Sequence, residues 1–135
     1  MTFVSRQVVR FAHIDAAGIV FYPRYFEMLN AAVEDYFARE IGVDFAEMHL
    51  DRKLGIPTVS LKTEFVAPSR LGDELDFVFS IGRVGRSSAD LSVEIRAGGE
   101  VRVRISLVLV CMDLETGRSA EWPSDMRPVP AAAAA

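Results

Sequence analysis

The sequence is poor in the residues on which several classes of protein depend. Its single cysteine, Cys111, cannot form a disulfide within the chain or supply a cysteine cluster for zinc. No stretch of eighteen apolar residues is present, and the first residues lack the apolar run of a secretory leader. The formal charge of −4 argues against a nucleic-acid-binding domain, which carries a surplus of Lys and Arg. We therefore expect a soluble, cytoplasmic protein that binds neither nucleic acid nor membrane.

Several catalytic motifs are missing as well. There is no Gly-x-Ser-x-Gly elbow and no phosphate loop of the Walker or dinucleotide type. His13 and His49 are the only imidazole bases, and no further ligand pair stands beside His13 and Asp15 at metal-binding spacing. Cys111 lies in an apolar stretch, which is typical of an inert core thiol. We expect no metal and no cofactor.

What the chain does contain is enough apolar sequence for one folded domain. It has 135 residues, of which 50% are hydrophobic and 25% charged, as in ordinary globular proteins. Between residues 22 and 41 apolar side chains recur every three or four positions, which predicts a long amphipathic helix. Pro23 suits its first turn, and Gly42 suits the left-handed residue that commonly follows a helix. We take residues 1–130 as a single domain and expect the terminal alanines, 131–135, to be disordered.

The rest of the chain has the pattern of strands. Residues 3–11 predict a first strand, and alternation with a period of two predicts four more, at 59–67, 74–81, 88–96 and 100–109. Because these four follow one another across short turns, we expect a four-stranded antiparallel meander. The helix must then bury its aromatic face against the apolar face of the sheet. The predicted fold class is α+β, with a curved five-stranded antiparallel sheet wrapped around a central helix.

One loop brings together groups that could take part in catalysis. Asp15 stands in a loop of small residues just before the long helix, whose first N–H groups have no partner within the helix. Those N–H groups could hold a thioester or ester carbonyl beside the carboxylate, as an oxyanion site. From the residues alone, a simpler role is favoured, in which Asp15 caps the loop or the helix.

The loop and its surroundings resemble a known family. The run His-Ile-Asp-Ala-Ala-Gly-Ile-Val-Phe-Tyr-Pro-Arg-Tyr-Phe at 13–26 precedes the helix, and Gly-Ile-Pro-Thr-Val-Ser at 55–60, Phe-Val-Ala-Pro at 65–68 and Gly72-Asp73 follow it. Over residues 3–127 the pattern resembles the 4-hydroxybenzoyl-CoA thioesterase family of the hotdog fold. The resemblance implies hydrolysis of an acyl-CoA with an aromatic or short acyl group to free CoA and a carboxylic acid. It also implies a homodimer, commonly paired into a homotetramer, with each acyl site between two protomers.

The resemblance further implies roles for individual residues. Asp15 would act as nucleophile or as general base toward water, and the backbone N–H of Tyr22 would polarise the carbonyl. The candidates for contact with the acyl group are His13, Gly18, Tyr25, Phe26, Val59 and Ser60. The candidates for contact with the CoA phosphates are Arg83, Arg86, Ser87 and Ser88 in one hairpin, with Lys62 and Arg70 as secondary ones. For His13 a structural role with a hydrogen-bonded ring fits equally well.

Two other functions remain open at this point. A hotdog hydratase or dehydratase would need a histidine and a carboxylate together, which His13 and Asp15 offer. A non-catalytic acyl-CoA or acyl-carrier binding protein would use the same pocket without turnover. Release of free thiol from an acyl-CoA separates a thioesterase from both.

Overall fold

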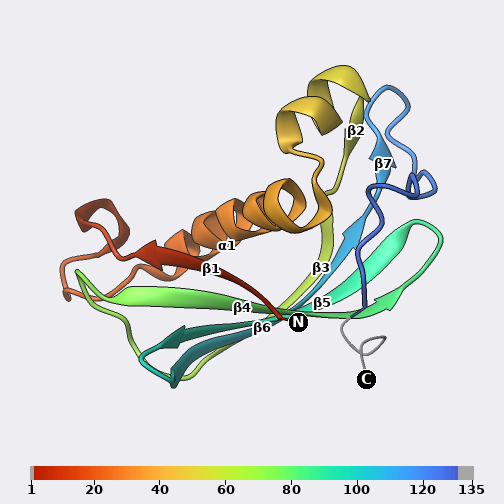
Figure 1. Ribbon diagram of the computed structural model, residues 1–135. Coiled ribbons are helices and arrows are strands. Elements are labelled where there is room, and N and C mark those ends of the chain that lie inside the picture. The colour runs from red at the N-terminus through yellow and green to blue at the C-terminus, as the bar shows by residue number, and fades with distance from the viewer. Residues whose placement is uncertain (1, 131–135) are drawn as a thin grey trace.

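The computed structural model describes residues 2–130, in which a curved five-stranded antiparallel sheet lies against one long helix (Figure 1). The strands of this sheet are β1 (Phe3–Val8), β3 (Thr58–Phe65), β4 (Glu74–Val84), β5 (Ser88–Ala97) and β6 (Glu100–Val110). A separate pair of short strands consists of β2 (Leu54–Gly55) and β7 (Met112–Asp113). This architecture confirms the predicted fold class. The alanines at 131–135, which we expected to be disordered, lie outside the described residues.

The predicted helix is confirmed at both of its ends. Helix α1 (Tyr22–Tyr36) has Pro23 in its first turn and continues as one π-helical turn (Phe37–Ile41). Gly42 follows with φ 91°, a left-handed conformation that favours glycine. One face of α1 is buried against the sheet, and its buried residues are Tyr25, Met28, Leu29, Ala32, Val33 and Tyr36. The spacing of these residues is the three-and-four pattern that predicted the helix.

The strand order differs from the expected meander in one pairing. The order in the sheet is β1-β4-β5-β6-β3, so only β4, β5 and β6 form a meander, and β3 lies on the far edge beside β6. The expected pairing of β3 with β4 is therefore wrong. The physical reason lies in the connecting segment, residues 66–73, where the N–H of Gly72 donates to the carbonyl of Val9 and the N–H of Val9 donates to the carbonyl of Asp73. These bonds lead the chain into the sheet beside β1 instead of back along β3.

The edge position of β3 also changes its burial. Its alternating apolar side chains were expected to be half-buried, but Val59, Leu61 and Phe65 are 60%, 44% and 50% exposed. Strand β3 pairs with β6 on one side only, so an apolar strand edge faces outward.

No helix in the described part of the chain has both the length and the apolar character to cross a membrane.

The segment after β6 folds back over the hairpin between β4 and β5. Trp122 is buried, its indole N–H donates to the carbonyl of Ser88 (3.1 Å), and its backbone N–H donates to the carbonyl of Arg86 (3.0 Å). Cys111, at the start of this segment, is fully buried. The C-terminal segment thus fixes the conformation of the hairpin on which the phosphate-binding candidates lie.

Candidate active site

A short loop before α1 holds Asp15 in a defined conformation. The N–H of Asp15 donates to the carbonyl of Ile19 (3.0 Å), and the N–H of Gly18 donates to the carbonyl of Asp15 (2.9 Å). Ile14 pairs with Val20 in an isolated antiparallel bridge, which closes the loop. Gly18 has φ 80°, a value that an L side chain rarely adopts, so the tight turn requires a glycine there. The side chain of Asp15 is exposed at the surface of this loop.

The carboxylate of Asp15 caps the loop and leaves the helix uncapped. Its Oδ1 accepts the N–H of Ala17 (2.9 Å). The residue before the first turn of α1 is Phe21, and no side chain caps that end of the helix. Within residues 2–130, Oδ2 of Asp15 accepts no hydrogen bond from the protein. One oxygen therefore holds the loop, and the other is available to water or a ligand.

The first N–H of α1 is available in the same region. Pro23 has no N–H, and the N–H of Arg24 donates to the carbonyl of Phe21 (2.8 Å). The N–H of Phe21 donates to the carbonyl of His13 (2.9 Å). Tyr22 is the first residue of the helix, so its N–H has no acceptor within the helix, and no other acceptor in the described chain receives it. A free N–H thus stands at the positive end of the helix dipole.

A cavity of about 290 Å³ lies beside this helix end. It is lined by Ile19, Val20, Tyr22, Tyr25, Phe65, Val66, Ala67 and Pro68. The ring of Phe65 lies 6.2 Å from that of Tyr22, 6.0 Å from that of Tyr25 and 6.4 Å from that of Phe26, measured between centroids. Tyr25, a candidate for acyl contact, lines this cavity, as does Tyr22, whose backbone N–H is the candidate carbonyl donor. Phe26 packs edge-on against Phe65 and does not line the cavity.

The ring of His13 is engaged in a structural hydrogen bond. Its Nδ1 accepts the backbone N–H of Arg10 (2.8 Å), so the proton of the neutral ring is on Nε2. Together with the bond from Phe21 to its carbonyl, this connects the turn at Phe11–His13 to the start of the helix. The geometry favours the structural role that the sequence left open for His13.

A second, larger cavity of about 530 Å³ lies at the other end of β3. Its walls include apolar residues such as Val33, Ile56, Leu109 and Met112, and its polar lining residues are Glu27, Asn30, Glu34, His49 and Thr58. None of these polar residues was predicted from the sequence as a site residue. The sequence feature that could have indicated them is the spacing 27, 30, 31 and 34, which places polar or small residues along the helix face opposite the buried one.

His49 and Gly55 shape the wall of the second cavity. Nδ1 of His49 lies 2.9 Å from the carbonyl of Phe45, so Nδ1 donates a hydrogen bond to this oxygen, and Nε2 of the neutral ring is an acceptor. A Cβ added at residue 55 would lie 2.9 Å from Cδ2 of Leu114 and 3.6 Å from Nε2 of His49. A side chain at 55 would therefore require the end of the Leu114 side chain to shift, while its Cβ would be in ordinary van der Waals contact with the imidazole.

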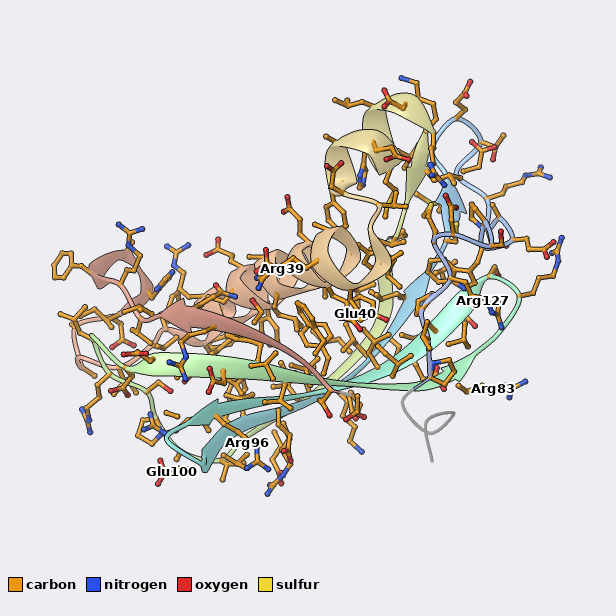
Figure 2. All side chains as sticks on the ribbon, viewed as in Figure 1. Arg39, Glu40, Arg83, Arg96, Glu100 and Arg127 are labelled. Carbon is orange, nitrogen blue, oxygen red and sulfur yellow. The ribbon has the colours of Figure 1, made fainter. Side chains whose placement is uncertain are left out.

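Three arginines lie at the hairpin between β4 and β5, and two of them, Arg83 and Arg86, were predicted from the sequence. Arg83 and Arg86 are exposed, and the one ion pair of Arg86 within residues 2–130 is a long contact of 3.7 Å with Glu121. Arg127 reaches the same hairpin from the C-terminal segment and donates to the carbonyls of Gly85 (2.8 Å) and Val84 (2.9 Å). Figure 2 shows Arg83 and Arg127 at the same end of the molecule. Sequence patterns miss Arg127 because its position depends on the fold of the C-terminal segment.

The remaining candidates lie elsewhere. Val59, Ser60 and Lys62 lie on the exposed edge strand β3 and line neither of the two cavities. Backbone carbonyls of Ser87 and Ser88 accept bonds from Cys111 and Trp122, which fixes the hairpin. The side chain of Arg70 is exposed, and its backbone N–H donates to Oδ2 of Asp73. Among the described residues, no group of three His, Cys, Asp or Glu side chains could hold a metal ion.

The predicted site residues therefore form two groups within one protomer. The loop with Asp15 and the helix start lie at one end of the sheet, and the arginine hairpin lies at the other end (Figure 1). Just after this hairpin, Ala89 pairs with Leu109, which lines the second cavity. Strand β3 runs between them, from Thr58 at the second cavity to Phe65 at the first.

Comparisons with known proteins agree on one family. Residues 9–129 match the thioesterase-like superfamily. A 1,4-dihydroxy-2-naphthoyl-CoA hydrolase from Thermosynechococcus vestitus is 29% identical over 101 residues, which cover 75% of this chain and 68% of the relative. The hydrolase of the same name from Nostoc punctiforme is 21% identical over 126 residues, covering 93% and 84% of the two chains.

Solved structures agree with the same fold. A 1,4-dihydroxy-2-naphthoyl-CoA thioesterase from Synechocystis superposes with a TM-score of 0.83 at 22% identity and covers 93% of this chain and 92% of its own. A gentisyl-coenzyme A thioesterase superposes with a TM-score of 0.83 at 29% identity and covers 91% and 98%. These likenesses confirm the hotdog fold that the sequence resemblance implied.

Proposed function

The chain belongs to the thioesterase-like superfamily, and on that premise we propose that it is an acyl-CoA thioesterase of the 4-hydroxybenzoyl-CoA type, with Asp15 as its catalytic carboxylate. The observation that carries the proposal is the free Oδ2 of Asp15 in a closed loop that leads directly to the free N–H of Tyr22. A carboxylate and an N–H donor near a helix start are the two groups that thioester hydrolysis needs. The names of the relatives, which are CoA hydrolases and thioesterases, support the same reaction.

Two routes fit these groups. In the first, Oδ2 of Asp15 attacks the thioester carbon, CoA leaves as a thiolate that takes a proton from water, and a second water hydrolyses the resulting anhydride. In the second, Asp15 removes a proton from water, the resulting hydroxide attacks the carbonyl carbon, the C–S bond breaks, and the protonated Asp15 returns its proton to the CoA thiolate. In both routes the carbonyl oxygen gains negative charge and accepts the N–H of Tyr22. Both end in CoA thiol, a carboxylic acid and a regenerated Asp15.

The minimal active unit in this proposal is a homodimer formed through β3. An unpaired apolar strand edge favours association, and the exposed Val59, Leu61 and Phe65 make β3 such an edge. The opposite edge, β1, carries Arg6, whose guanidinium pairs with Asp76 and Glu74 on the neighbouring strand. A charged residue of this kind discourages strand pairing. Two such dimers would form the tetramer that the sequence resemblance implies.

Antiparallel pairing of β3 with its copy would complete the site. A two-fold axis places the Phe65 end of one strand beside the Thr58 end of the other. The Asp15 loop of one protomer would then face the second cavity and the arginine hairpin of its partner. Arg83, Arg86, Arg127 and Lys62 would bind the CoA phosphates, and the larger cavity would hold the acyl group. Val59 and Ser60 would lie at the seam between the two halves.

The lining of the larger cavity favours an aromatic acyl group that carries hydroxyls. Its apolar walls suit a flat ring, while Asn30, Glu34 and the acceptor Nε2 of His49 suit hydroxyl donors. The acyl groups in the names of the relatives, dihydroxynaphthoyl and gentisyl, are of this class.

The test is release of free thiol across a panel of thioesters. The panel contains 1,4-dihydroxy-2-naphthoyl-CoA, gentisyl-CoA, 4-hydroxybenzoyl-CoA, benzoyl-CoA, phenylacetyl-CoA, butyryl-CoA and one acyl-carrier thioester. We expect the hydroxylated aromatic CoA thioesters to have the highest kcat/KM. Binding of these compounds without thiol release would favour a non-catalytic binding protein, and addition or loss of water at an enoyl-CoA would favour a hydratase.

A further inference from the structure

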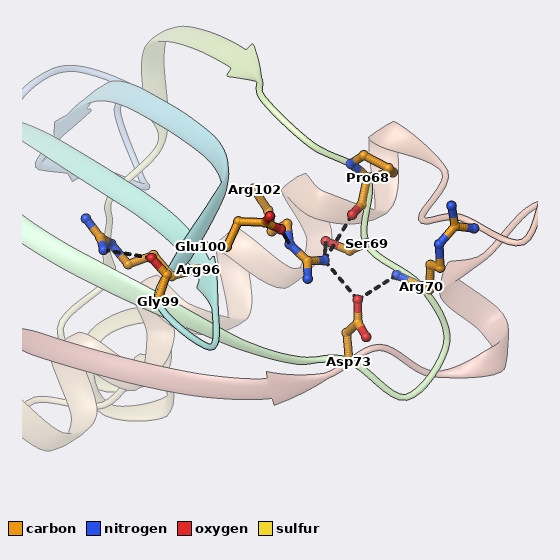
Figure 3. Close-up of polar contacts among 8 residues, drawn as sticks. All are labelled: Pro68, Ser69, Arg70, Asp73, Arg96, Gly99, Glu100 and Arg102. Carbon is orange, nitrogen blue, oxygen red and sulfur yellow. Dashed lines mark hydrogen bonds and ion pairs between the residues drawn. The ribbon is translucent and has the colours of Figure 1, made fainter.

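The Gly72-Asp73 motif lies in the segment 66–73, which Arg102 on β6 binds along its length (Figure 3). The backbone carbonyl of Arg102 accepts the N–H groups of Val66 (2.8 Å) and Ala67 (3.1 Å). Its Nη1 donates to the carbonyl of Pro68 (2.9 Å), to Oγ of Ser69 (3.2 Å) and to Oδ2 of Asp73 (2.8 Å). One arginine thus contacts both ends of the segment.

This cluster is more buried than the other arginine pairs of the protein. The side chain of Arg102 is 15% exposed and that of Asp73 is 31% exposed, against 61% for Arg6 in its pairs with Asp76 and Glu74. Ser69 is fully buried. Oδ2 of Asp73 also accepts the N–H of Arg70 (2.9 Å), which closes the turn. Charge-assisted bonds with little competition from water hold a segment firmly.

The other side of the segment is bonded to the loop that carries Asp15. The carbonyl of Ser69 accepts the N–H of Val20 (2.9 Å), and Arg70 forms an antiparallel bridge with Ile19. Ile19 is the residue whose carbonyl holds the N–H of Asp15. A continuous set of hydrogen bonds therefore runs from Arg102 through Ser69 to the Asp15 loop.

The same segment also shapes the cavity at the helix start. Val66 and Ala67, whose N–H groups bind the carbonyl of Arg102, line this cavity together with Pro68, Tyr22 and Tyr25. A shift of the segment would move the cavity wall and the loop together. Catalysis depends on sub-ångström placement, and misplacement by about 1 Å can lower a rate by about 100-fold.

We propose that Arg102 is a positioning residue for Asp15 and Tyr22, acting through Asp73 and Ser69 on the segment 66–73. The inference rests on the proposed thioesterase function and extends it to a residue that touches neither substrate half. Its loss lowers turnover, because the carboxylate and the N–H donor no longer hold their relative positions. It leaves KM nearly unchanged, because the arginine hairpin and the larger cavity lie at the other end of the sheet.

The experiment compares Arg102→Met, Arg102→Lys and Asp73→Asn with Arg6→Met, each with and without Asp15→Asn. Arg6→Met is the matched control: Arg102 bonds two carboxylates, Asp73 and Glu100, and Arg6 likewise bonds two, Asp76 and Glu74, but contacts neither the segment 66–73 nor the loop. We expect Arg102→Met to lower kcat by about 10- to 100-fold with KM changed less than about threefold. Arg102→Lys, which keeps the charge near Asp73, recovers part of kcat. In the Asp15→Asn background Arg102→Met adds no further loss, because both changes disable the same carboxylate.

Amide hydrogen exchange gives a readout that does not depend on turnover. Exchange at residues 15–22 should be faster in Arg102→Met and Asp73→Asn and unchanged in Arg6→Met. Normal kcat and normal exchange in a folded Arg102→Met protein would overturn the inference, as would an equal loss with and without Asp15→Asn. If Arg102→Met does not fold, the values of kcat and the amide exchange of Arg102→Lys and Asp73→Asn test the inference in its place. Failure of the proposed function looks different: Asp15→Asn alone leaves kcat intact, while the exchange result still tests the positioning role.

Discussion

Asp15 and Arg86 lie beyond opposite ends of strand β4. The loop of Asp15 adjoins the turn that enters β4 at Glu74, and Arg86 lies in the hairpin that leaves it after Val84. The eleven residues of β4 span about 35 Å. The proposed catalytic carboxylate and the proposed phosphate ligand of one chain therefore face different regions of the surface.

Replacing Asp15 tests the chemistry itself. Asp15→Asn keeps an oxygen that can accept the N–H of Ala17, so the loop should stay closed, but it removes the charge. We expect kcat to fall by about 100-fold or more with a modest change in KM, the scale of losing a positioned base or nucleophile. The N–H of Tyr22 still polarises the carbonyl, which leaves a residual rate. A near-normal kcat in a protein with unchanged thermal unfolding would return Asp15 to a role in capping the loop.

The hairpin arginines should affect the CoA half of the substrate alone. Contacts to phosphates far from the reacting carbon bind the ground state and the transition state equally, so Arg86→Ala and Arg127→Ala should mainly raise KM. We expect an effect on acyl-CoA and none on the matching acyl-pantetheine, which lacks the nucleotide. Arg39→Ala is the control, because Arg39 lies on the turn after α1 and pairs with Asp35. Equal losses with both thioesters would rule out the phosphate assignment.

Sequence predicted the features that depend on neighbouring residues. The ends of α1 follow from Pro23 and Gly42, which act through their own backbone preferences, and the alternation in β4, β5 and β6 follows from the pleat. The place of β3 was not predictable in this way. Short connections favour pairing with the next strand, and only the bonds between Val9 and the turn at Gly72-Asp73 show that β1 takes that position.

The candidate site likewise combines features that are local in the sequence with contacts between distant residues. The Asp15 loop is local and can be found from a motif, as can the helix start at Tyr22. Arg127 and Arg102 act across 42 and 29 residues of sequence, on Gly85 and Asp73 respectively, so no local pattern indicates their partners. Strand β3 is a further case. Its apolar alternation is evident in the sequence, but this pattern does not indicate whether the same chain or a second molecule covers those side chains.

Acid should destabilise the protein through its paired aspartates. Hydrogen bonds from the N–H of Arg70 and the guanidinium of Arg102 hold the pKa of Asp73 below its usual value, and Arg6 does the same for Asp76. A lowered folded pKa contributes stability above the unfolded pKa, and that stability is lost as pH falls through the folded value. We expect Tm to decline below about pH 4. Asp73→Asn should flatten the decline relative to Asp90→Asn, since the exposed Asp90 forms no ion pair within residues 2–130.

The buried thiol should take no part in the reaction. Burial raises the pKa of Cys111, so its thiol stays neutral and is a poor nucleophile near pH 7. Cys111→Ala should keep kcat within about twofold while lowering Tm, because it removes a buried atom from the core. Iodoacetamide should label the native protein far more slowly than the unfolded protein. Rapid native labelling that stops thiol release would reopen a cysteine mechanism.

Complementation between two damaged variants tests the shared site. If each site takes Asp15 from one protomer and Arg86 from the other, a heterodimer of Asp15→Asn and Arg86→Ala has one site with both residues intact and one with neither. Random mixing gives about half heterodimers, so the mixture should regain about a quarter of the wild-type rate at substrate concentrations below KM. The two variants are denatured, mixed and then refolded together. The control is the two variants refolded separately.

The same mixing experiment separates the proposed interface from a site within one chain. If both residues of a site came from the same chain, every heterodimer would contain only singly damaged sites, and the mixture would show the average of the two variants. Leu61→Lys supplies the structural control, because Leu61 lies in the middle of β3, where a charge opposes pairing with a second β3. We expect this variant to sediment as a monomer and to lose both the rate and the complementation. A fully active Leu61→Lys monomer would show that one chain holds a complete site.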